Sequence, residues 1–514
     1  MARKIEWGQV WPSLEEFTEL TASRRVVPVV TKILVDDAAP VSLYRQLAQS
    51  QPGTFLLESA EHDGRWSRWS FIGVNSRAAL VARDGKARWF GDVPEGIATS
   101  GSTLEVLTSA MAELTSEPVE GLPPLTGGMV GALGWDIIFD WEPNLKRKAI
   151  SEHTTPDVAM CLADDVVAVD HHESAVWLIA NAINRNNTPD GVERAYIDAV
   201  ARLDALRTQL AAPVTLAPAV VGNEPAPEPE LRTPQLEFEA AVLRGKEAIV
   251  DGDVFQVVLS QRADIDCPAE PLEVYRVLRT INPSPYMYYL QLPDDADEAG
   301  FAVVGSSPET LMRAIDGRVS TFPIAGSRPR GKTAHEDRDL AEELLKDPKE
   351  LAEHVMLVDL ARNDLAKVCE PGTVEVVELM DIKRFSHIMH ISSTVEGIIR
   401  PGVSAVECLS ATFPAGTLSG APKPRAIELI DELEPARRGI YGGVIGYFDF
   451  SGNADLAIAI RTAVIAGGRA TVQAGAGIVA DSVPTTEFIE TRNKAAAAVR
   501  AIQQAARLVP VDVD

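Results

Sequence analysis

The chain has 514 residues, more than one hydrophobic core usually supports, so two domains are expected. Asp and Glu number 74 against 48 Lys and Arg, and the net charge of -26 repels phosphate backbones and anionic lipid surfaces. We therefore expect neither nucleic acid nor a membrane as a partner.

The four cysteines, Cys161, Cys267, Cys369 and Cys408, are far apart in the chain and form no CxxC pair. This spacing is typical of free thiols in a reducing compartment and indicates no zinc site. The first residues lack an apolar core followed by a small-residue cleavage site, and no apolar run reaches about 18 residues. The expected location is the cytoplasm.

The first 210 residues mix helical and strand patterns without strict alternation. Helices are expected near 13–22, 104–114 and 191–210, and strands at 54–59, 69–74, 78–90, 127–135 and within 158–183. Such mixing favours an α+β fold over a doubly wound sheet. Residues 211–234 are rich in proline and lack periodicity, which predicts a linker between an N-terminal domain (1–210) and a C-terminal domain (235–514).

The C-terminal part contains many strand patterns and few helical crossovers. Expected helices cover 238–251, 335–363, 404–412, 424–434 and 484–508, and expected strands begin at 255 and cover 287–291, 302–306, 318–324, 373–378, 388–396, 443–450 and 457–466. The predicted fold class is therefore α+β, with large antiparallel β-sheets packed face to face and flanked by helices.

Two glutamate pairs stand out, Glu350/Glu353 and Glu487/Glu490, each spaced i,i+3 on a predicted helix. Each pair directs two carboxylates to one helical face, and the fold could bring the pairs together. Such a cluster would need a hard divalent cation, most simply Mg²⁺. The alternative is a solvated helix face, or, for the second pair, carboxylates that complement a helix dipole.

The run GTLSGAPK, from Gly416 to Lys423, lacks the G-x-x-x-x-G-K-[ST] spacing, so a nucleotide triphosphatase is rejected. Its backbone amides, and those of Gly475 to Gly477, could still bind a carboxylate, although turn formation explains each glycine equally well.

Three further side chains could hold a substrate carboxylate: Arg461, Lys494 and Tyr441. Surface salt bridges are the ordinary alternative for the two cations. His390 is an acid–base candidate, or otherwise a histidine buried in the core.

Several runs occur in the order found in a known family: GDVFQVVLSQR (252–262), GSSPETL (305–311), PIAGSRPRG (323–331), EHVMLVDLARNDL (353–365), FPAGTLSGAPKPRA (413–426) and TEFIETRNKA (486–495). Through these runs the chain closely resembles the chorismate-utilising enzymes, and among them the large-subunit (component I) family of anthranilate synthases. The resemblance covers nearly the whole C-terminal part.

The resemblance implies that chorismate binds beside Mg²⁺, with Glu353 and Glu490 as direct ligands and Glu350 and Glu487 in an outer shell. It implies that Glu309 gives a proton to the departing C4 hydroxyl while ammonia attacks C2, which requires a raised pKa. His390 would assist the later loss of pyruvate. Thr417 is carried over both as a catalytic and as a substrate-binding residue, and the further substrate positions are Gln256, Gly326, Ser327, Tyr441, Arg461, Gly475, Ala476, Gly477 and Lys494.

Two positions distinguish the reaction. Relatives that add water carry a lysine where this chain has Gln256, and the aminodeoxychorismate synthase subunit carries a nucleophilic lysine where this chain has Ala325. Both substitutions imply direct attack by ammonia and formation of anthranilate. Two alternatives are kept: a synthase that stops at 2-amino-2-deoxyisochorismate, and a catalytically silent tryptophan sensor.

The N-terminal part resembles the same family through FLLESA (55–60), RWSFIG (68–73) and GGMVGALGWD (128–136). The resemblance implies a pocket for feedback inhibition by tryptophan, which makes residues 1–210 a regulatory domain. The residues implied are Leu57, Glu58, Ser59, Pro285, Tyr286 and Met287. The structural alternative is an edge strand packed on an aromatic turn.

The chain has no Cys/His/Glu glutaminase signature. Ammonia would therefore come from a glutamine amidotransferase subunit (component II), which the resemblance places with this chain in a heterotetramer.

Overall fold

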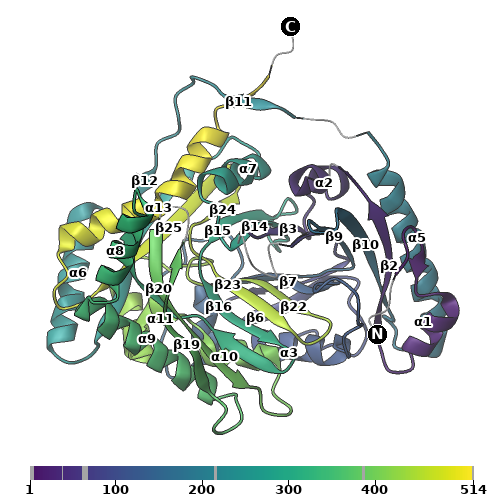
Figure 1. The fold of residues 1–514 in the computed structure, drawn as a ribbon, viewed down its shortest axis with the longest axis horizontal. Coiled ribbons are helices and arrows are strands. Elements are labelled where there is room, and N and C mark those ends of the chain that lie inside the picture. The colour runs from purple at the N-terminus through teal and green to yellow at the C-terminus, as the bar shows by residue number, and fades with distance from the viewer. Residues whose placement is uncertain (1–4, 37–38, 61–67, 214–216, 385–387, 512–514) are drawn as a thin grey trace.

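The computed structural model describes residues 5–36, 39–60, 68–213, 217–384 and 388–511. Its architecture is two large antiparallel sheets packed face to face, with helices on their outer faces (Figure 1). The predicted fold class is confirmed.

Within the described residues the first sheet has thirteen strands, in the order β1-β2-β10-β9-β4-β3-β14-β15-β24-β25-β13-β12, with β21 paired to β13. Their bounds are β1 Val10–Trp11, β2 Val26–Leu34, β3 Thr54–Glu58, β4 Trp69–Asn75, β9 Asp165–Asp170, β10 Ala175–Ile183, β12 Glu230–Leu231, β13 Gln256–Asp266, β14 Tyr286–Leu292, β15 Phe301–Ser307, β21 Gly420–Ala421, β24 Thr462–Ala466 and β25 Arg469–Ile478.

The second sheet has eleven strands within the same described ranges, in the order β18-β20-β17-β16-β23-β22-β7-β8-β5-β6, with β19 paired to β20. Their bounds are β5 Ala78–Arg83, β6 Lys86–Gly91, β7 Gly128–Leu133, β8 Val158–Leu162, β16 Thr310–Ile315, β17 Arg318–Thr321, β18 Ile324–Pro329, β19 Glu375–Arg384, β20 Ile388–Ile398, β22 Val444–Asp449 and β23 Ala454–Ile458. A small ribbon of β11 (Ala219–Val221) and β26 (Leu508–Pro510) lies apart from both sheets, at the top of Figure 1.

The core between the sheets is apolar because alternate residues of facing strands point inward. Val130 and Ala132 of β7 lie in one buried cluster with Leu290 of β14 and Val303 of β15, all completely buried. This apolar layer packs the two sheets against each other.

The outer faces are covered by helices with apolar stripes. On the first sheet lie α1 Leu14–Leu20, α2 Pro40–Leu47, α5 Pro189–Leu210, α7 Pro271–Ile281 and α13 Pro484–Ala505. On the second lie α3 Thr103–Leu114, α8 Ala334–Leu344, α9 Pro348–Ala366 and α10 Ala405–Thr412. Near β13 lie α6 Gln235–Val250, α11 Gly416–Ser419 and α12 Lys423–Leu433, and the short η1 Trp135–Ile137 and α4 Ile138–Trp141 follow β7.

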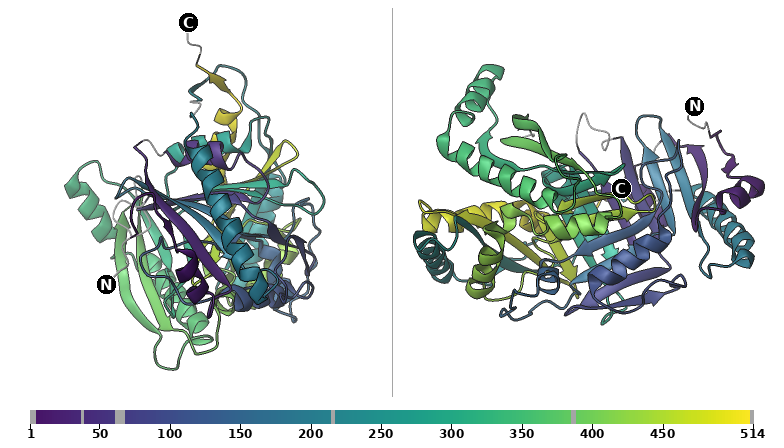
Figure 2. Two further views of the ribbon diagram at one scale, coloured as in Figure 1. Left: turned by 90° about the vertical axis from the view of Figure 1, so that its right-hand side faces the viewer. Right: turned by 90° about the horizontal axis from the view of Figure 1, so that it is seen from below.

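Both large sheets contain strands from before and after segment 211–234. In the first sheet β3 pairs with β14, and in the second β7 pairs with β22. Figure 2 shows the purple and blue N-terminal segments continuing into the green and yellow C-terminal ones. A regulatory role for residues 1–210 and a catalytic role for residues 235–514 stay predictions. In space, the two parts share both sheets.

Several predicted elements are divided where the backbone must turn. Range 78–90 is a hairpin that turns at Asp84 and Gly85, both with positive φ. Range 335–363 is two helices, because Asp347 caps the second one and Pro348 begins it. Range 457–466 spans the end of β23 and the whole of β24, which belong to different sheets.

Three further differences concern two strand regions and one helix. Range 318–324 splits into β17 and β18 around Phe322 and Pro323. β2 is not among the predicted strands, because its internal Pro28 obscures the strand pattern. α7 is not among the predicted helices, although its buried Leu272, Tyr275 and Leu278 follow helical spacing.

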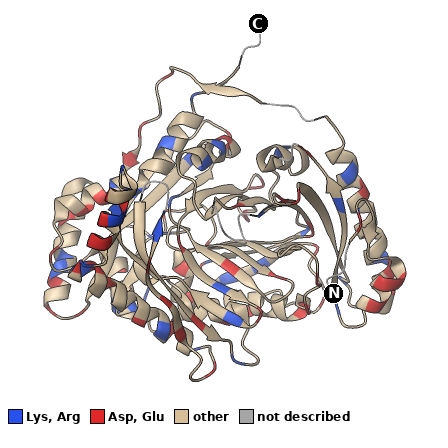
Figure 3. Ribbon diagram, in the orientation of Figure 1, with Lys and Arg blue, Asp and Glu red and all other residues tan. Residues whose placement is uncertain are grey.

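Acidic and basic residues are interspersed over the molecule and occur on strands as well as on helices. Figure 3 shows Asp and Glu next to Lys and Arg along the helices at both ends of the molecule.

Candidate functional site

A cavity of about 390 Å³ lies between β13 and β25, β18 and β20, and helices α9 and α13. Its size falls in the range of small-molecule sites. The sequence-predicted residues that line it are Gln256, Glu309, Gly326, Ser327, Glu350, Glu353, His390, Thr417, Tyr441, Arg461, Gly475, Gly477, Glu487, Glu490 and Lys494. Segments more than 200 residues apart in the chain therefore meet at one site.

The acid pairs enter this cavity from two helices. Asp347 caps α9 by accepting from the backbone N–H groups of Lys349 (3.0 Å) and Glu350 (3.3 Å), which orients the first turn. Burial and the neighbouring Glu353 raise the pKa of Glu350. Burial likewise raises the pKa of Glu487 on α13.

The other two acids already have partners. Glu353 Oε1 accepts from Gln256 Nε2 at 3.3 Å, and Glu490 pairs with Lys494 at 2.8 Å. Among the described residues, no three His, Cys, Asp or Glu side chains are arranged as a preformed metal site. The cavity thus gathers four carboxylates, a donor set that fits a hard cation, without converging them on one point.

Glu309 lies between β15 and β16, where its backbone carbonyl accepts from the N–H of Ile458 at 2.9 Å. Burial raises the pKa of its carboxyl group. A hydrogen bond of 3.1 Å from Thr417 Oγ1 and the charges of Lys494 and Arg461 oppose that shift. Burial thus favours the protonated form of this carboxyl group more than water would, which is the direction that a general acid needs.

His390 on β20 is oriented by β18. Its Nδ1 lies 2.9 Å from the carbonyl oxygen of Gly326, and since a carbonyl only accepts, Nδ1 carries the proton. Burial lowers the pKa of His390, and Arg461 and Lys494 lower it further. The neutral ring therefore holds its lone pair on Nε2, as a base does.

Gly326 makes this contact possible. It has φ +64 and lies at a break in the β18–β20 register, between Ala325 and Ser327. This left-handed conformation is unfavourable for residues with a Cβ. A Cβ here would also stand 3.0 Å from Glu350 Oε2, so the glycine admits both the bulge and the carboxylate.

Arg461 and Lys494 form the cationic wall. Arg461 has φ +54, an unusual conformation for a non-glycine residue, and donates to the carbonyl oxygen of Lys494. Lys494 Nζ donates to the carbonyl oxygen of Gly475 at 3.0 Å. Two cations held by backbone contacts suit an anionic substrate in an otherwise acidic molecule.

Glycines of β25 make room for two polar side chains. A Cβ on Gly475 would stand 2.7 Å from the Tyr441 hydroxyl, and one on Gly477 would stand 2.5 Å from Gln256 Nε2. Ala476, between them, points to the opposite face of the strand and packs in the core, so its side chain lies outside the cavity.

Several residues that line the cavity, among them Lys349 and Gln473, are not among those predicted from the sequence. Strand alternation could have found Gln473, two residues before Gly475. The charge of Lys349 acts on Glu487 of the opposite helix, a relation that no local pattern reveals.

A second cavity, of about 60 Å³, lies between the sheets. All six residues predicted for tryptophan line it: Leu57, Glu58, Ser59, Pro285, Tyr286 and Met287. On its far wall Asp455 accepts from the Tyr286 hydroxyl at 2.7 Å, which ties the two sheets together.

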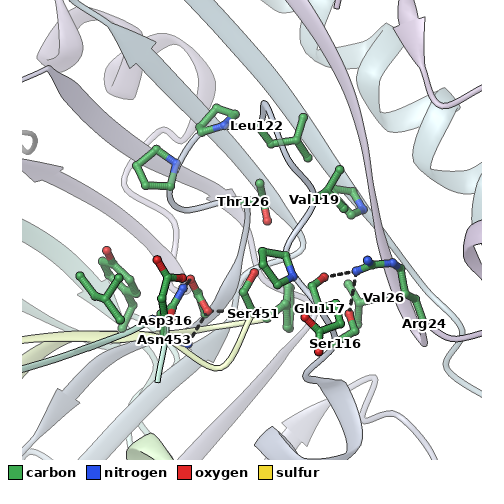
Figure 4. A pocket seen from close by; sticks show the side chains of 18 of the residues that line it. Arg24, Val26, Ser116, Glu117, Val119, Leu122, Thr126, Asp316, Ser451 and Asn453 are labelled. Carbon is green, nitrogen blue, oxygen red and sulfur yellow. Dashed lines mark hydrogen bonds between the residues drawn. The ribbon is translucent and has the colours of Figure 1, made fainter. Parts of the chain in front are cut away.

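A third cavity, of about 180 Å³, contains none of the predicted residues (Figure 4). Its polar groups bind one another: Arg24 donates to the carbonyl of Glu117 and to Ser116, and the backbone N–H of Asp316 donates to Asn453. It is therefore not the candidate active site.

In the described part of the chain, no helix is both long and apolar enough to span a bilayer.

Comparisons with known proteins agree with this geometry. Residues 52–500 match the model of the family described as chorismate binding enzyme. The chain is 52% identical over 512 residues to anthranilate synthase component 1 of Arthrobacter globiformis, covering 99% of this chain and 96% of that protein. It is 51% identical over 505 residues to the component 1 protein of Mycobacterium tuberculosis (strain ATCC 25618 / H37Rv), covering 96% of each.

Solved structures agree as well. The crystal structure of anthranilate synthase component I from Streptococcus pneumoniae TIGR4 superposes with a TM-score of 0.73 at 33% identity, covering 86% of this chain and 94% of that one. MenF, the menaquinone-specific isochorismate synthase of Escherichia coli, superposes with a TM-score of 0.69 at 18% identity, covering 96% and 99%, which shows a shared fold. The chain belongs to the chorismate-binding enzyme family and, within it, to the anthranilate synthase component 1 proteins.

Proposed function

We propose that the protein converts chorismate and ammonia into anthranilate and pyruvate. The observation that carries this proposal is the single cavity that unites a carboxyl group of raised pKa, a neutral histidine and two cations. Gln256 and Ala325 support ammonia as the nucleophile, because neither offers the lysine that would activate water or attack the ring.

Each residue then has a role. Arg461 and Lys494 hold substrate carboxylate, and the Tyr441 and Thr417 hydroxyls orient it. Glu309 gives its proton to the departing C4 hydroxyl as ammonia attacks C2. His390, through Nε2, takes the C2 proton in the second stage, when the C3–O bond breaks and the ring becomes aromatic. The released enolpyruvate gains a proton on its methylene carbon and becomes pyruvate.

The four glutamates, Glu350, Glu353, Glu487 and Glu490, would hold Mg²⁺. When bound, Mg²⁺ would neutralise and orient the ring carboxylate of the substrate. Burial, and then a neighbouring carboxylate, raise the pKa of Glu350 and of Glu487, and a bound cation would offset both effects.

We further propose that tryptophan binds in the cavity between the sheets and inhibits the reaction. A glutamine amidotransferase subunit would supply ammonia in a heterotetramer, and the complex would work in the cytoplasm. The convergence of Leu57 to Ser59 with Pro285 to Met287 on one cavity supports the tryptophan site. The designation component 1 of the curated relatives supports a partner subunit.

The test is direct. The purified chain, supplied with ammonium salt, Mg²⁺ and chorismate, should form fluorescent anthranilate and an equal amount of pyruvate. Product without pyruvate would indicate a synthase that stops at 2-amino-2-deoxyisochorismate, and no turnover together with tryptophan binding would indicate a sensor.

The metal role has its own prediction. Glu353→Gln should lower kcat/KM by at least about a hundredfold and weaken Mg²⁺ binding measured by calorimetry, because one anionic ligand is lost. Asp359→Asn, on an exposed part of the same helix, is the matched control and should change neither value. Unchanged Mg²⁺ binding in Glu353→Gln would refute the metal assignment.

A further inference from the structure

Arg438 is a buried guanidinium beside the active-site cavity, in the segment between α12 and Tyr441. Its side chain is 1% exposed, and it forms a two-pronged ion pair with Glu434, at 2.9 Å (Nε to Oε2) and 2.6 Å (Nη2 to Oε1). It does not line the cavity. A charge buried this deeply needs hydrogen-bond partners, and these partners identify the segments that Arg438 holds together.

The remaining donors of Arg438 bind two backbone segments. Nη1 donates to the carbonyl oxygen of Leu418 at 2.7 Å, and Nη2 donates to that of Val258 at 2.8 Å. Leu418 follows Thr417, and Val258 lies on β13 two residues after Gln256. Each segment carries a residue of the cavity wall.

The guanidinium also lies against two aromatic rings. Its carbon is 4.3 Å from the ring centre of Trp135 and 5.5 Å from that of Tyr441. Trp135 belongs to η1 in the N-terminal part of the chain, and its backbone N–H donates to the carbonyl oxygen of Gly439 at 2.7 Å. The guanidinium thus lies against the ring of Tyr441, whose hydroxyl lies next to Gly475 of β25.

Glu434 extends the network to the opposite strand. Its Oε1 accepts from the backbone N–H (2.8 Å) and hydroxyl (2.7 Å) of Ser260, and that hydroxyl accepts from Gln473 Nε2 at 2.8 Å. Gln473 lines the cavity on β25. The Arg438–Glu434 pair thus joins the Thr417 segment, β13, Tyr441 and β25.

We propose that Arg438 is a positioning residue for the substrate site, acting through Tyr441 and Thr417. The inference rests on the proposed function. A buried ion pair adds little net stability, because apolar replacement of both partners is often neutral, whereas a planar fork of five donors fixes geometry. What the pair supplies is the relative placement of four wall segments.

The experiment removes both charges together, since Arg438→Met alone would leave Glu434 buried and unpaired. Arg438→Met with Glu434→Gln keeps an acceptor for Ser260. It should unfold at a lower temperature than the wild type, because the carbonyl groups of Leu418 and Val258 lose their donor, so binding is measured well below that temperature. The dissociation constant of chorismate, measured by calorimetry without ammonia, should rise about ten- to a hundredfold, and kcat/KM should fall by a similar factor. If this variant fails to fold, Arg438→Lys keeps one charge contact but loses the fork, and should show a smaller loss in the same direction.

The matched control is Arg202→Met with Asp165→Asn. Arg202 is partly buried, with 14% of its side chain exposed; it pairs with Asp165 and donates to the carbonyl oxygen of Asn181 at 2.7 Å, on the first sheet away from the cavity. This control should leave chorismate affinity at the wild-type value.

A double-mutant cycle identifies the route of the effect. Tyr441→Phe combined with the Arg438/Glu434 change should weaken chorismate binding by less than the product of the separate effects, because both disturb the same hydroxyl. Unchanged chorismate affinity in a folded Arg438/Glu434 variant would overturn the positioning role, as would fully independent effects. A wild-type protein that neither binds nor converts chorismate would instead refute the proposed function.

Discussion

At the residue scale, the glutamates of the cavity differ in burial and in hydrogen-bond partners. Burial raises the pKa of Glu309, which lies close to a single hydroxyl, Thr417, whereas Glu353 and Glu490 have a hydrogen-bond donor and a cation as partners. Burial therefore favours the protonated form at Glu309, the form that a general acid needs, while Glu353 and Glu490 each lie next to a hydrogen-bond donor. Sequence spacing alone could not separate these roles.

The pH dependence follows from the raised pKa of Glu309. A general acid works while protonated, so kcat should hold below that pKa and fall as the pH rises through it. Thr417 stabilises the ionised form, and Thr417→Val should therefore move the alkaline limb to higher pH, along with any loss of rate. Initial rates at constant free ammonia, from pH 5 to 9, measure this limb. Glu309→Gln should lower kcat by about 10²- to 10⁴-fold without a limb. A limb that Thr417→Val shifts to lower pH would contradict the assignment.

At the element scale, the bulge in β18 shapes the cavity more than the regularly paired part of the strand does. The bulge at Gly326 turns a carbonyl toward His390 and leaves space for Glu350. The rest of the strand pairs with β20 in ordinary register. Bulges commonly re-aim side chains beside active sites.

Gly326→Ala tests this element. The alanine must keep the positive φ of Gly326, at a cost of about 1–2 kcal/mol, and its Cβ would press on Glu350. We expect a lower unfolding temperature and a loss of kcat/KM of at least about tenfold, because His390 and Glu350 both move. Steady-state kinetics and calorimetry measure the two effects.

Gly317→Ala is the matched control, since Gly317 also has positive φ but has open space around its Cβ position. It should lose stability without a loss of kcat/KM. Equal kinetic loss in both variants would show that strain alone is responsible.

At the scale of the whole molecule, the two sheets couple distant segments. The small cavity takes Leu57 from β3 and Tyr286 from β14 on one sheet, and Tyr447 and Asp455 from the other. The Tyr286 hydroxyl also lies 2.9 Å from Thr310, the residue that follows Glu309. A ligand in this cavity would therefore bear on both sheets and on the strand that begins next to the proposed acid.

Tyr286→Phe should raise the tryptophan concentration for half-inhibition by about tenfold, because it removes the hydroxyl that joins the sheets at Asp455. Inhibition curves at fixed chorismate measure this change. Tyr44→Phe, which removes a buried hydroxyl bonded to Thr54 elsewhere on the first sheet, should leave the curve unchanged. Equal inhibition of the Tyr286 variant and the wild type would refute the link.

The sequence by itself determined the fold class, the acid pairs on their helices and the family, because periodicity and motif order are local properties. It placed element ends poorly where one residue forces a turn: Pro348 divides a predicted helix, and the 457–466 range crosses from one sheet to the other. Only the tertiary structure decided that Ala476 faces the core, that Lys349 acts on Glu487, and that Arg438 joins the cavity walls. These relations depend on burial and on contacts between distant segments, and burial sets the pKa of Glu309 and of His390.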